Sequence, residues 1–302
     1  MPGPSLFSEI AVCPLCGRAA APGDRFCERD GTPLEDDPAV QVLAPAPDLA
    51  AATRRGRAHE VDEDAYALGR RERDGRPLHV LVVCDGVSAS SHGEQASARA
   101  AEAALDTLLA AADAPGPLDP PGALRDAVRA AHQAACAPGI EAVPGKAASG
   151  TTIVAALVHA GGLDVAWVGD SRAYLVRPAA AQLLTHDHSW LNEVVESGEL
   201  TAAEARRAPS AHALTRCLGP LENPDPGQPP EPSLAAVAVP FEGRLVLCSD
   251  GLWNGADAPE AIAALVAAAP ATADARSLAV HLVRRGYAST GHDDVTAAVA
   301  FL

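Results

Sequence analysis

Aromatic side chains are scarce in this 302-residue chain, which has three Trp, three Tyr and four Phe and is 3% aromatic. Hydrophobic residues nevertheless make up 48% of the sequence, so a sizeable core must be built mainly from Ala, Val and Leu. Long hydrophobic runs are also missing, because no stretch approaches the roughly 20 apolar residues that span a bilayer. The N-terminal MPGPSLFSEI has neither a basic nor an apolar region, so we expect no signal peptide and no membrane association.

Positive charge is in short supply as well. The chain has 23 Lys and Arg against 39 Asp and Glu, which gives a formal net charge of −16. So acidic a chain is a poor partner for nucleic acid or an anionic membrane. Of the seven Cys, Cys84 and Cys248 lie inside apolar runs, where buried free thiols suit a reducing compartment. We therefore expect a cytoplasmic monomer that binds no nucleic acid.

Composition divides the chain into three parts. Residues 1–35 are rich in turns and contain Cys, residues 36–52 mix Pro, Ala and acid without periodicity and are predicted to be a linker, and residues 53–302 alternate apolar runs with Ala-rich stretches. The short apolar runs predict strands at 78–84, 151–160, 163–169, 173–177, 244–249 and 295–302. The Ala-rich stretches predict helices at 93–113, 123–136, 190–198, 259–269 and 275–287. Because several strands follow one another directly, this order favours an α+β fold with antiparallel sheets.

Acidic residues stand at the ends of two predicted strands. The runs LHVLVVC and RLVLCS end in the same dipeptide, as Asp85-Gly86 and Asp250-Gly251. The strand fixes the backbone of such an acid, and the glycine lets a ligand approach or lets its own carbonyl coordinate. A simple turn is the alternative for either dipeptide taken alone.

Three further acidic positions accompany these two. Glu63-Asp64 precedes a predicted strand, Asp170 lies in a turn between two strands, and Asp293-Asp294 opens the last strand. Each alone has a simpler explanation as a cap, a hairpin turn or an edge charge. Gathered in one crevice, these carboxylates would raise one another's pKa unless a cation lay among them. Oxygen ligands without matching His or Cys favour Mg²⁺ or Mn²⁺ over zinc.

The N-terminal part has the spacing of a zinc-ribbon-like knuckle. Cys13 and Cys16 are followed by Cys27, and Asp30 stands at the position of a fourth Cys. A Cys₃Asp tetrahedron is chemically reasonable for zinc, and so short a segment has little core on which to fold without metal. We expect one structural Zn²⁺ with a structural or recruiting role, and a decayed site without metal is the alternative.

An ordered set of motifs in the third part carries a family resemblance. The motifs are Glu63-Asp64, Asp85-Gly86, SGTT (149–152), VGDSRAY (168–174), LTHDHS (184–189), LTRCLG (214–219), CSDGLW (248–253) and DDVT (293–296). From about residue 53 to the C-terminus, the chain resembles the metal-dependent, type-2C protein serine/threonine phosphatases in their bacterial form. Each motif alone is weak, but the ordered set is specific. The resemblance implies a β-sandwich of two antiparallel sheets flanked by helices, with metal ions in a channel at one end.

The resemblance also implies a metal ligand set. Asp85 would bridge two ions, with the carbonyl of Gly86 on one of them, and Asp250 and Asp293 would complete the carboxylates of the other. Glu63 would bind the opposite metal or hold its waters. Two Mg²⁺ or Mn²⁺ ions are therefore expected, and hydroxide formed between them would attack phosphorus in line.

Further roles follow from the same resemblance. Asp64 would orient a coordinated water, and Asp170 would help to bind a third, weaker metal. Residues 185–219 would form a flap beside the active site. No cysteine nucleophile is needed, so Cys84 and Cys248 are expected to be strand core.

The sequence departs from the family pattern at two positions. The arginine that often precedes the Glu-Asp pair and clamps the substrate phosphate is replaced by His59, and Arg57 stands two residues earlier. Either could contact phosphate, His59 only when protonated, while Arg57 could equally be a surface charge. Val87 replaces the histidine that follows the Asp-Gly pair in some relatives. The leaving group would then take its proton from a metal-bound water or from another histidine, such as His92.

The sequence leaves two kinds of function open. The first is an enzyme that hydrolyses phosphoserine or phosphothreonine on proteins that are substrates of a serine/threonine kinase. The second is a catalytically weak pseudophosphatase or adaptor that binds phosphoproteins, with the knuckle recruiting partners. Retention of every metal carboxylate favours the enzyme, since a decayed site should have lost one.

Overall fold

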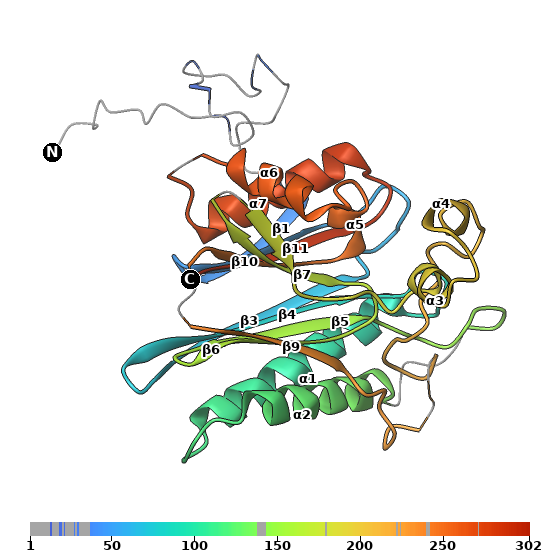
Figure 1. Cartoon of the computed structure of the whole chain (residues 1–302), viewed down its shortest axis with the longest axis horizontal. Helices are drawn as coiled ribbons and strands as arrows, with labels where there is room; N and C mark the ends of the chain where they lie inside the picture. The colour runs from blue at the N-terminus through green and yellow to red at the C-terminus, as the bar shows by residue number, and fades with distance from the viewer. Residues whose placement is uncertain are drawn as a thin grey trace, which may run out of the picture.

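The protein is described here by a computed structural model that covers residues 37–137, 143–178, 180–221, 223, 225–239, 242–270 and 272–302, with residues 13, 18, 19, 21, 27 and 29 near the N-terminus. Two antiparallel sheets lie face to face, and helices cover the outer face of each, so four layers are stacked in Figure 1. The predicted α+β sandwich of two antiparallel sheets flanked by helices is confirmed.

One sheet has six strands. Its members, in spatial order, are β1 (Val40–Ala46), β2 (Leu49–Arg54), β11 (Val295–Phe301), β10 (Arg244–Cys248), β7 (Arg172–Arg177) and β8 (Ala180–Leu183). The register places Ala297 of β11 between Ala52 of β2 and Cys248 of β10. The second strand of the chain therefore pairs with the last one, and folding of this sheet needs both ends of the domain.

The other sheet has five strands. Its members, in spatial order, are β3 (Asp64–Arg73), β4 (Arg76–Asp85), β5 (Ile153–His159), β6 (Gly162–Val168) and β9 (Ser233–Ala238). The long β3–β4 hairpin turns at Asp74-Gly75, where both residues have positive φ, 54° and 71°. This is the geometry of a two-residue type I′ turn, which keeps the two strands in a fixed register.

The helices form the two outer layers and one lateral extension. On the five-stranded sheet lie α1 (Gly93–Asp113) and α2 (Pro120–Ala135), and on the six-stranded sheet lie α6 (Pro259–Ala267) and α7 (Ala275–Ser289). The short helices α3 (Trp190–Glu196) and α4 (Ala202–Ala205) project to one side in Figure 1, within the predicted flap, and α5 (Asp250–Trp253) follows β10 directly.

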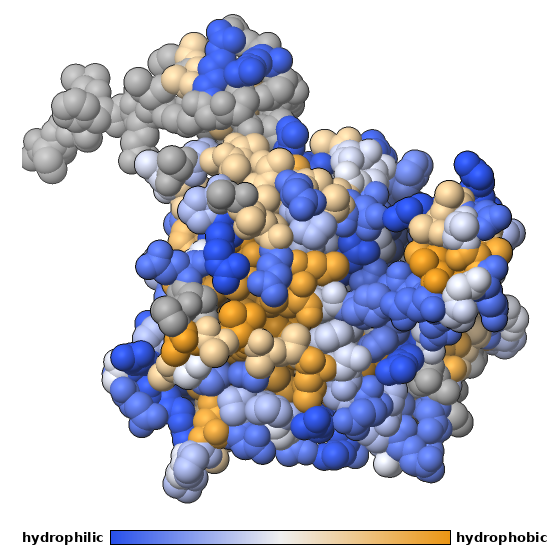
Figure 2. All heavy atoms as spheres, in the orientation of Figure 1, coloured by the Kyte–Doolittle hydropathy of each residue, from blue (hydrophilic) through white to orange (hydrophobic). Residues whose placement is uncertain are grey.

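The core consists mainly of small aliphatic side chains, as the scarcity of aromatics predicts. Leu81, Val83, Val154, Leu245 and Leu247 are among the fully buried residues that fill the space between the sheets. Figure 2 shows apolar side chains gathered in the middle of one face, at the level where the sheet edges lie, with hydrophilic side chains around them. No helix in the described part of the chain is long and apolar enough to cross a membrane.

The interpretation of residues 36–52 as a linker is wrong. Residues from Val40 onward form β1 and β2, and Leu49 to Ala52 of β2 are fully buried. An alanine run carries little strand propensity, so the local sequence does not reveal a strand. Pairing with β11 and burial by helix α7 and the opposite sheet stabilise it instead. The folded domain therefore begins near Val40, before the predicted boundary at residue 53.

The other predicted elements are found with their ends moved by a few residues. The helix expected at 93–113 coincides with α1, and the strand expected at 78–84 lies within β4. Besides β1 and β2, four short elements were not predicted, namely β8, β9, α4 and α5. Elements of four to six residues are too short to show a clear hydrophobic period.

Candidate active site

Four of the predicted acidic residues line one cavity. It has a volume of about 490 Å³, and its walls include Asp85, Asp170, Asp250 and Asp293. These four come from four separate segments, 85 to 293 in the sequence. The separate strand ends identified in the sequence therefore converge on one space.

The sandwich brings these residues together because each stands at the end of a strand. Asp85 is the last residue of β4, and Asp250 begins α5 two residues after the end of β10. Asp170 lies in the turn between β6 and β7, and Asp293 lies just before β11. Two hydrogen bonds to Thr152 fix the backbone of Asp85. The N–H of Asp85 donates to Thr152 Oγ1 over 3.1 Å, and its carbonyl accepts from Thr152 N over 2.8 Å.

The carboxylates oppose one another electrostatically. Burial, followed by the charges of Asp64, Asp250, Asp170 and Asp293, raises the pKa of Asp85 well above its ordinary value. Burial and the charges of Asp170 and Asp293 likewise raise the pKa of Asp250. Burial and the charge of Asp187 raise the pKa of Asp170 to about 7. Hard divalent cations would relieve this repulsion, so the donor set fits Mg²⁺ or Mn²⁺.

Gly86 stands where only glycine fits. A Cβ at this position would lie 2.6 Å from the backbone of Gly93 and 2.7 Å from the carbonyl oxygen of Glu63. Its N–H donates to that same Glu63 carbonyl over 3.0 Å. The close packing of α1 against the Asp85-Gly86 turn therefore places a bare backbone on the cavity wall, as a carbonyl ligand requires.

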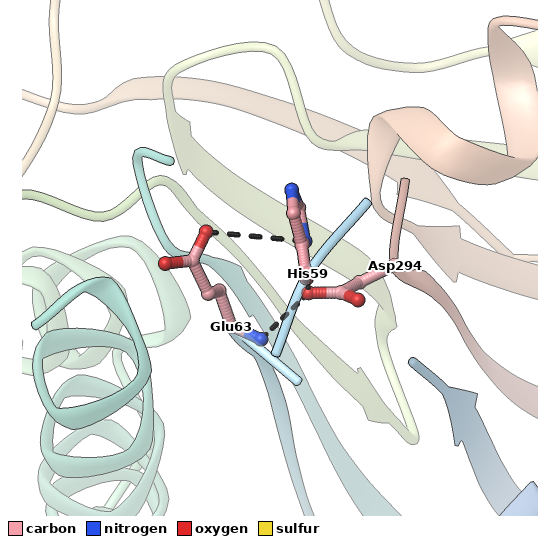
Figure 3. A group of neighbouring side chains, drawn as sticks. All are labelled: His59, Glu63 and Asp294. Atoms are coloured by element: carbon pink, nitrogen blue, oxygen red, sulfur yellow. Dashed lines mark hydrogen bonds and ion pairs between the residues drawn. The ribbon is translucent and has the colours of Figure 1, made fainter. Parts of the chain in front are cut away.

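Glu63 lies in a neighbouring group with His59 and Asp294 (Figure 3). Its carboxylate turns toward the ring of His59, at 3.9 Å from Oε2 to Nδ1, and Oε2 is buried with no hydrogen-bond partner. Glu63 is not among the residues that line the cavity with Asp85. A buried acceptor without a donor is costly, and water held by a nearby cation would satisfy it.

Asp294 organises this group. It is only 2% exposed, and its carboxylate accepts from Gly56 N and Glu63 N, each over 2.6 Å, and contacts His59 Nδ1 at 2.9 Å. These contacts fix the loop before β3, so Asp294 is a structural residue of the site. Its neighbour Asp293 is left facing the cavity.

His59 is held by carboxylates. Burial lowers the pKa of His59, but the hydrogen bond to Asp294 and the charges of Asp294, Asp293 and Glu63 outweigh it, so the pKa is raised. Nε2 lies 3.7 Å from Asp293 Oδ1 and 3.4 Å from Ser88 Oγ. Both Asp293 and Ser88 line the cavity, so the ring lies at its edge.

Arg57 has a different environment. Its Nε donates to Gly291 O over 3.1 Å, and its guanidinium lies 5.0 Å from the ring centre of Tyr287 on α7. It is not among the residues that line the cavity. These contacts give no support to Arg57 as a phosphate ligand, and they match the surface-charge alternative.

Asp64 lies deep beside the cavity. It is 9% exposed, its Oδ2 accepts from Ser249 Oγ over 2.7 Å, and burial followed by the charge of Asp62 raises its pKa well above the ordinary value. His92, considered as a proton donor, begins α1 with a positive φ of 54°, and its Nδ1 lies 3.4 Å from Glu94 Oε1. It is not among the cavity-lining residues.

The flap, residues 185–219, supplies the remaining wall. His212, Leu214, Arg216 and Cys217 line the cavity opposite the acidic residues. A bridge between Ser189 and Leu214 closes the base of the flap. Within the described part of the chain, no hydrogen bond or ion pair engages the side chain of Arg216, which is exposed.

Arg216 lies in the motif LTRCLG (214–219) and His212 just before it, but neither residue has a role predicted from the sequence. Spacing alone could not assign one, because the flap is a loop and its fold decides which side chains reach the cavity. The available signal was the presence of a basic residue, Arg216, in the flap, which the resemblance already places beside the active site.

The N-terminal knuckle is described only in part. Cys16 and Asp30 lie outside the described residues. Cys13 and Cys27 are 0% and 5% exposed, and Cys13 N donates to Arg18 O over 2.8 Å.

Comparison with known proteins gives the family. The family model described as Protein phosphatase 2C matches residues 63–295, which includes every acidic residue of the cavity. The chain belongs to the protein phosphatase 2C family. Cys84 and Cys248 are fully buried in it, as expected of strand core, and burial raises the pKa of both thiols.

Several members of the protein phosphatase 2C family are similar to the chain. It is 32% identical over 253 residues to the serine/threonine protein phosphatase PstP of Mycobacterium tuberculosis, which covers 83% of this chain and 44% of PstP. The crystal structure of the Ser-Thr phosphatase MsPP of Mycobacterium smegmatis with cacodylate is 33% identical, with a TM-score of 0.62, and covers 84% of this chain and 97% of that one. The catalytic domain of PstP in complex with two manganese ions is 27% identical, with a TM-score of 0.63, over 87% and 97%.

The match covers only part of each curated relative. The chain spans less than half the length of the first curated relatives that it matches, 44% for PstP of Mycobacterium tuberculosis and 39% for the phosphatase stp of Listeria welshimeri.

Proposed function

We propose that the chain is a metal-dependent protein phosphatase that hydrolyses phosphoserine and phosphothreonine. The observation that carries the proposal is the convergence of Asp85, Asp170, Asp250 and Asp293 on one cavity. Membership of the protein phosphatase 2C family supports the same reaction. Phosphorylated proteins, the products of serine/threonine kinases, are the proposed substrates.

The acidic residues would hold the cations. Asp85 with the carbonyl of Gly86, and Asp250 with Asp293, are the proposed ligands of a pair of Mg²⁺ or Mn²⁺ ions, and Asp170 belongs to a third, weaker site. A divalent pair, when bound, lowers the pKa of water between the ions and offsets the negative charge of the phosphoryl group. Four carboxylates alone would repel that group.

Other side chains of this chain would handle the substrate. Arg216 is the guanidinium on the cavity wall, so it would bind the phosphoryl oxygens from the flap side. His59, at the cavity edge, would contact the phosphate in its protonated form, which Asp294 favours. Asp64, bonded to Ser249, would accept a hydrogen bond from the attacking water and so orient it. Glu63, whose Oε2 has no hydrogen-bond partner, would hold water of the nearer cation.

A pseudophosphatase is the weaker alternative. The acidic residues repel one another, so keeping them together costs stability. In a protein that no longer catalyses the reaction, at least one of them would be expected to have been replaced. All four remain on the cavity, and the pKa values of Asp85 and Asp250 are raised well above the ordinary range. This retained electrostatic repulsion favours an active enzyme.

The test is hydrolysis of p-nitrophenyl phosphate and of a phosphothreonine peptide with Mn²⁺. Asp85→Ala and Asp250→Ala should each lower kcat/KM by about 10³-fold or more, which corresponds to about 4 kcal/mol of transition-state stabilisation. Asp113→Ala is the matched control, because Asp113 is an exposed carboxylate paired with Arg71 on the opposite end of the hairpin. Mn²⁺-independent hydrolysis, or full activity of Asp85→Ala, would overturn the proposal.

We also propose that the N-terminal segment, residues 1–35, binds one structural Zn²⁺ through Cys13, Cys16, Cys27 and Asp30. The burial of Cys13 and Cys27 supports this, since a segment with so little core needs another reason to bury them. One zinc per chain by elemental analysis, lost in Cys13→Ser/Cys27→Ser, is expected. A metal content that is unchanged in this variant would contradict the knuckle.

We further propose that the protein is a cytoplasmic monomer that binds neither nucleic acid nor membranes. The buried free thiols of Cys84 and Cys248 suit a reducing compartment, and the acidic composition disfavours nucleic acid and anionic membranes. Light scattering after size exclusion, with and without Mn²⁺, tests the monomer. A dimer mass at micromolar concentration would contradict it.

A further inference from the structure

The helix that carries Asp250 is too short to hold itself in place. Helix α5 is four residues long, Asp250–Trp253, and the side chain of Ser249 before it makes no cap hydrogen bond. One turn of helix has no stability of its own. The position of the Asp250 carboxylate must therefore be set by what the other residues of α5 contact.

On one side, α5 rests on the segment before β11. A Cβ on Gly251 would collide with the carbonyl oxygen of Asp294, so the two backbones pack directly on one another. This contact fixes Asp250 relative to Asp293, the residue that precedes Asp294. Glycine is required here for space, not for a special φ.

On the other side, Trp253 joins α5 to the turn that carries Asp170. Its indole Nε1 donates to the carbonyl oxygen of Asp170 over 3.0 Å. Trp253 is also three residues after Asp250, so the two side chains leave the same face of a helical turn. The indole N–H therefore sets the spacing between the backbones that carry two of the four cavity carboxylates.

Arg172 packs on the face of the Trp253 ring. The guanidinium of Arg172 lies 3.6 Å from the centre of the Trp253 ring, a cation–π contact, and Arg172 is only 7% exposed. Arg172 is bidentate on Asp187, with Nε to Oδ1 at 3.0 Å and Nη2 to Oδ2 at 2.7 Å. Asp187 lies in the first residues of the flap, so one stack connects the flap base to the acidic cavity.

We infer that Trp253 is a positioning residue, which sets the spacing of Asp170 and Asp250 through its hydrogen bond to the Asp170 carbonyl and its stack on Arg172. The inference deepens the proposed function and rests on it, because the spacing matters only where these two carboxylates share cations. The expected consequence is weaker metal binding when Trp253 is lost. Without the indole hydrogen bond, the backbones that carry Asp170 and Asp250 would have to be ordered each time a cation binds, and this ordering costs binding free energy.

The test compares two Trp→Phe variants of the full chain. Trp253→Phe keeps a ring for Arg172 to stack on and removes the N–H. Trp167→Phe is the matched control, because Trp167 Nε1 also donates to a backbone carbonyl over 2.7 Å, but that carbonyl belongs to His186, which does not line the acidic cavity as Asp170 does. Mn²⁺ binding is measured by isothermal titration calorimetry, independently of catalysis.

Trp253→Phe should weaken the weakest Mn²⁺ binding step by about tenfold, while Trp167→Phe should bind Mn²⁺ as the unmodified chain does. In hydrolysis, the Mn²⁺ concentration for half-maximal rate should rise in Trp253→Phe, and the rate at saturating Mn²⁺ should change less. Trp253→His, which restores a ring N–H, should recover part of the affinity. Equal isotherms for the two Phe variants would overturn the inference, whereas failure of the unmodified chain to bind Mn²⁺ would instead overturn the proposed function.

A folding defect is distinguished by thermal melting in the absence of metal. Both Phe variants lose one indole hydrogen bond, so their melting temperatures should fall by similar amounts. Should Trp253→Phe fail to fold while Trp167→Phe folds, Arg172→Lys provides the second arm, since it keeps the charge and weakens the stack. Unchanged Mn²⁺ affinity in that variant would also count against the inference.

Discussion

Asp64 and Asp85 are directly paired across the β3–β4 hairpin, as the first residue of one strand and the last residue of the other. This places two carboxylates side by side at one end of the sheet, and the charge of Asp64 is the largest contribution after burial to the raised pKa of Asp85. Like charges directly opposite one another destabilise a strand pair. The hairpin therefore accepts a structural cost at the point where the proposed cations bind.

Asp85→Asn should separate stability from activity. Removing one charge relieves the repulsion at the end of the hairpin, so the metal-free protein should melt higher by roughly 2–6 °C, given about 2–4 °C per kcal/mol for a domain of this size. Hydrolysis of p-nitrophenyl phosphate should be lost at the same time. Calorimetry in EDTA and an activity assay in Mn²⁺ provide the two readouts, and a lower melting temperature would show that repulsion at this position is not dominant.

The stability of the metal-free protein should fall as the pH rises. The pKa of Asp170 is about 7 in the folded state, above an ordinary carboxyl pKa of about 4. Folding therefore takes up a proton between these two pKa values, and stability declines with increasing pH across that window. Asp85, Asp250 and His59, whose pKa values are also raised, contribute in the same direction.

Melting curves in EDTA at pH 5.5, 6.5 and 7.5 provide the measurement for this dependence. The midpoint should drop by several degrees over the series, and saturating Mn²⁺ at pH 7.5 should reverse the drop. Asp274, a helix cap with a lowered pKa, loses its contribution only in more acidic solution. His188, whose pKa burial lowers to about 4, acts in the opposite direction up to its ordinary pKa of about 6.5, so the drop should be clearest between pH 6.5 and 7.5. A midpoint that rises with pH in EDTA would contradict the repulsive cavity.

Arg216 and Arg57 should differ in their effect on substrate binding. Arg216→Ala removes the guanidinium on the cavity wall, so KM for a phosphopeptide should rise by about tenfold, as expected for loss of a charge-assisted contact of about 1.5 kcal/mol or more. Arg57→Ala removes contacts with Gly291 and Tyr287, so KM should stay the same and the melting temperature should fall slightly. An increased KM in Arg57→Ala alone would reverse these assignments.

Two N-terminal truncations should locate the domain boundary. Removal of residues 1–36 leaves β1 and β2 in place, so the remainder should stay soluble and active. Removal of residues 1–54 exposes the edge of β11 and the apolar face of α7 that β2 covers, so the protein should aggregate or lose activity. Soluble, active protein from residue 55 onward would show that β2 is dispensable.

The sequence predicted the fold and most of the site because the informative residues stand at strand ends. Asp85, Asp250 and Asp293 follow or precede long apolar runs, so their location at one edge of the sandwich followed once the strands were recognised. Four short elements were missed because they are too short to show a period, and β1 and β2 were missed for a different reason. The Ala50–Ala52 run becomes a strand through its neighbours, and local propensity carries no trace of it.

Side-chain contacts were the other part that the sequence could not supply. Nothing in the spacing of Arg57 and His59 indicates that one is bound to Gly291 and the other to Asp294. Both partners lie more than 200 residues away in the chain, which makes them tertiary information. The same holds for Trp253, whose partner is a backbone carbonyl from another turn.

The scarcity of aromatic residues has a practical consequence. The three tryptophans of the chain are Trp167, bonded to the flap carbonyl of His186, Trp190 at the start of α3, and Trp253 on Asp170. Tryptophan fluorescence therefore originates only from the flap and from residues that contact the flap or the Asp170 turn. The unlabelled protein has its own optical reporter, and titrating it with Mn²⁺ or a phosphopeptide should register movements of that region without an added dye.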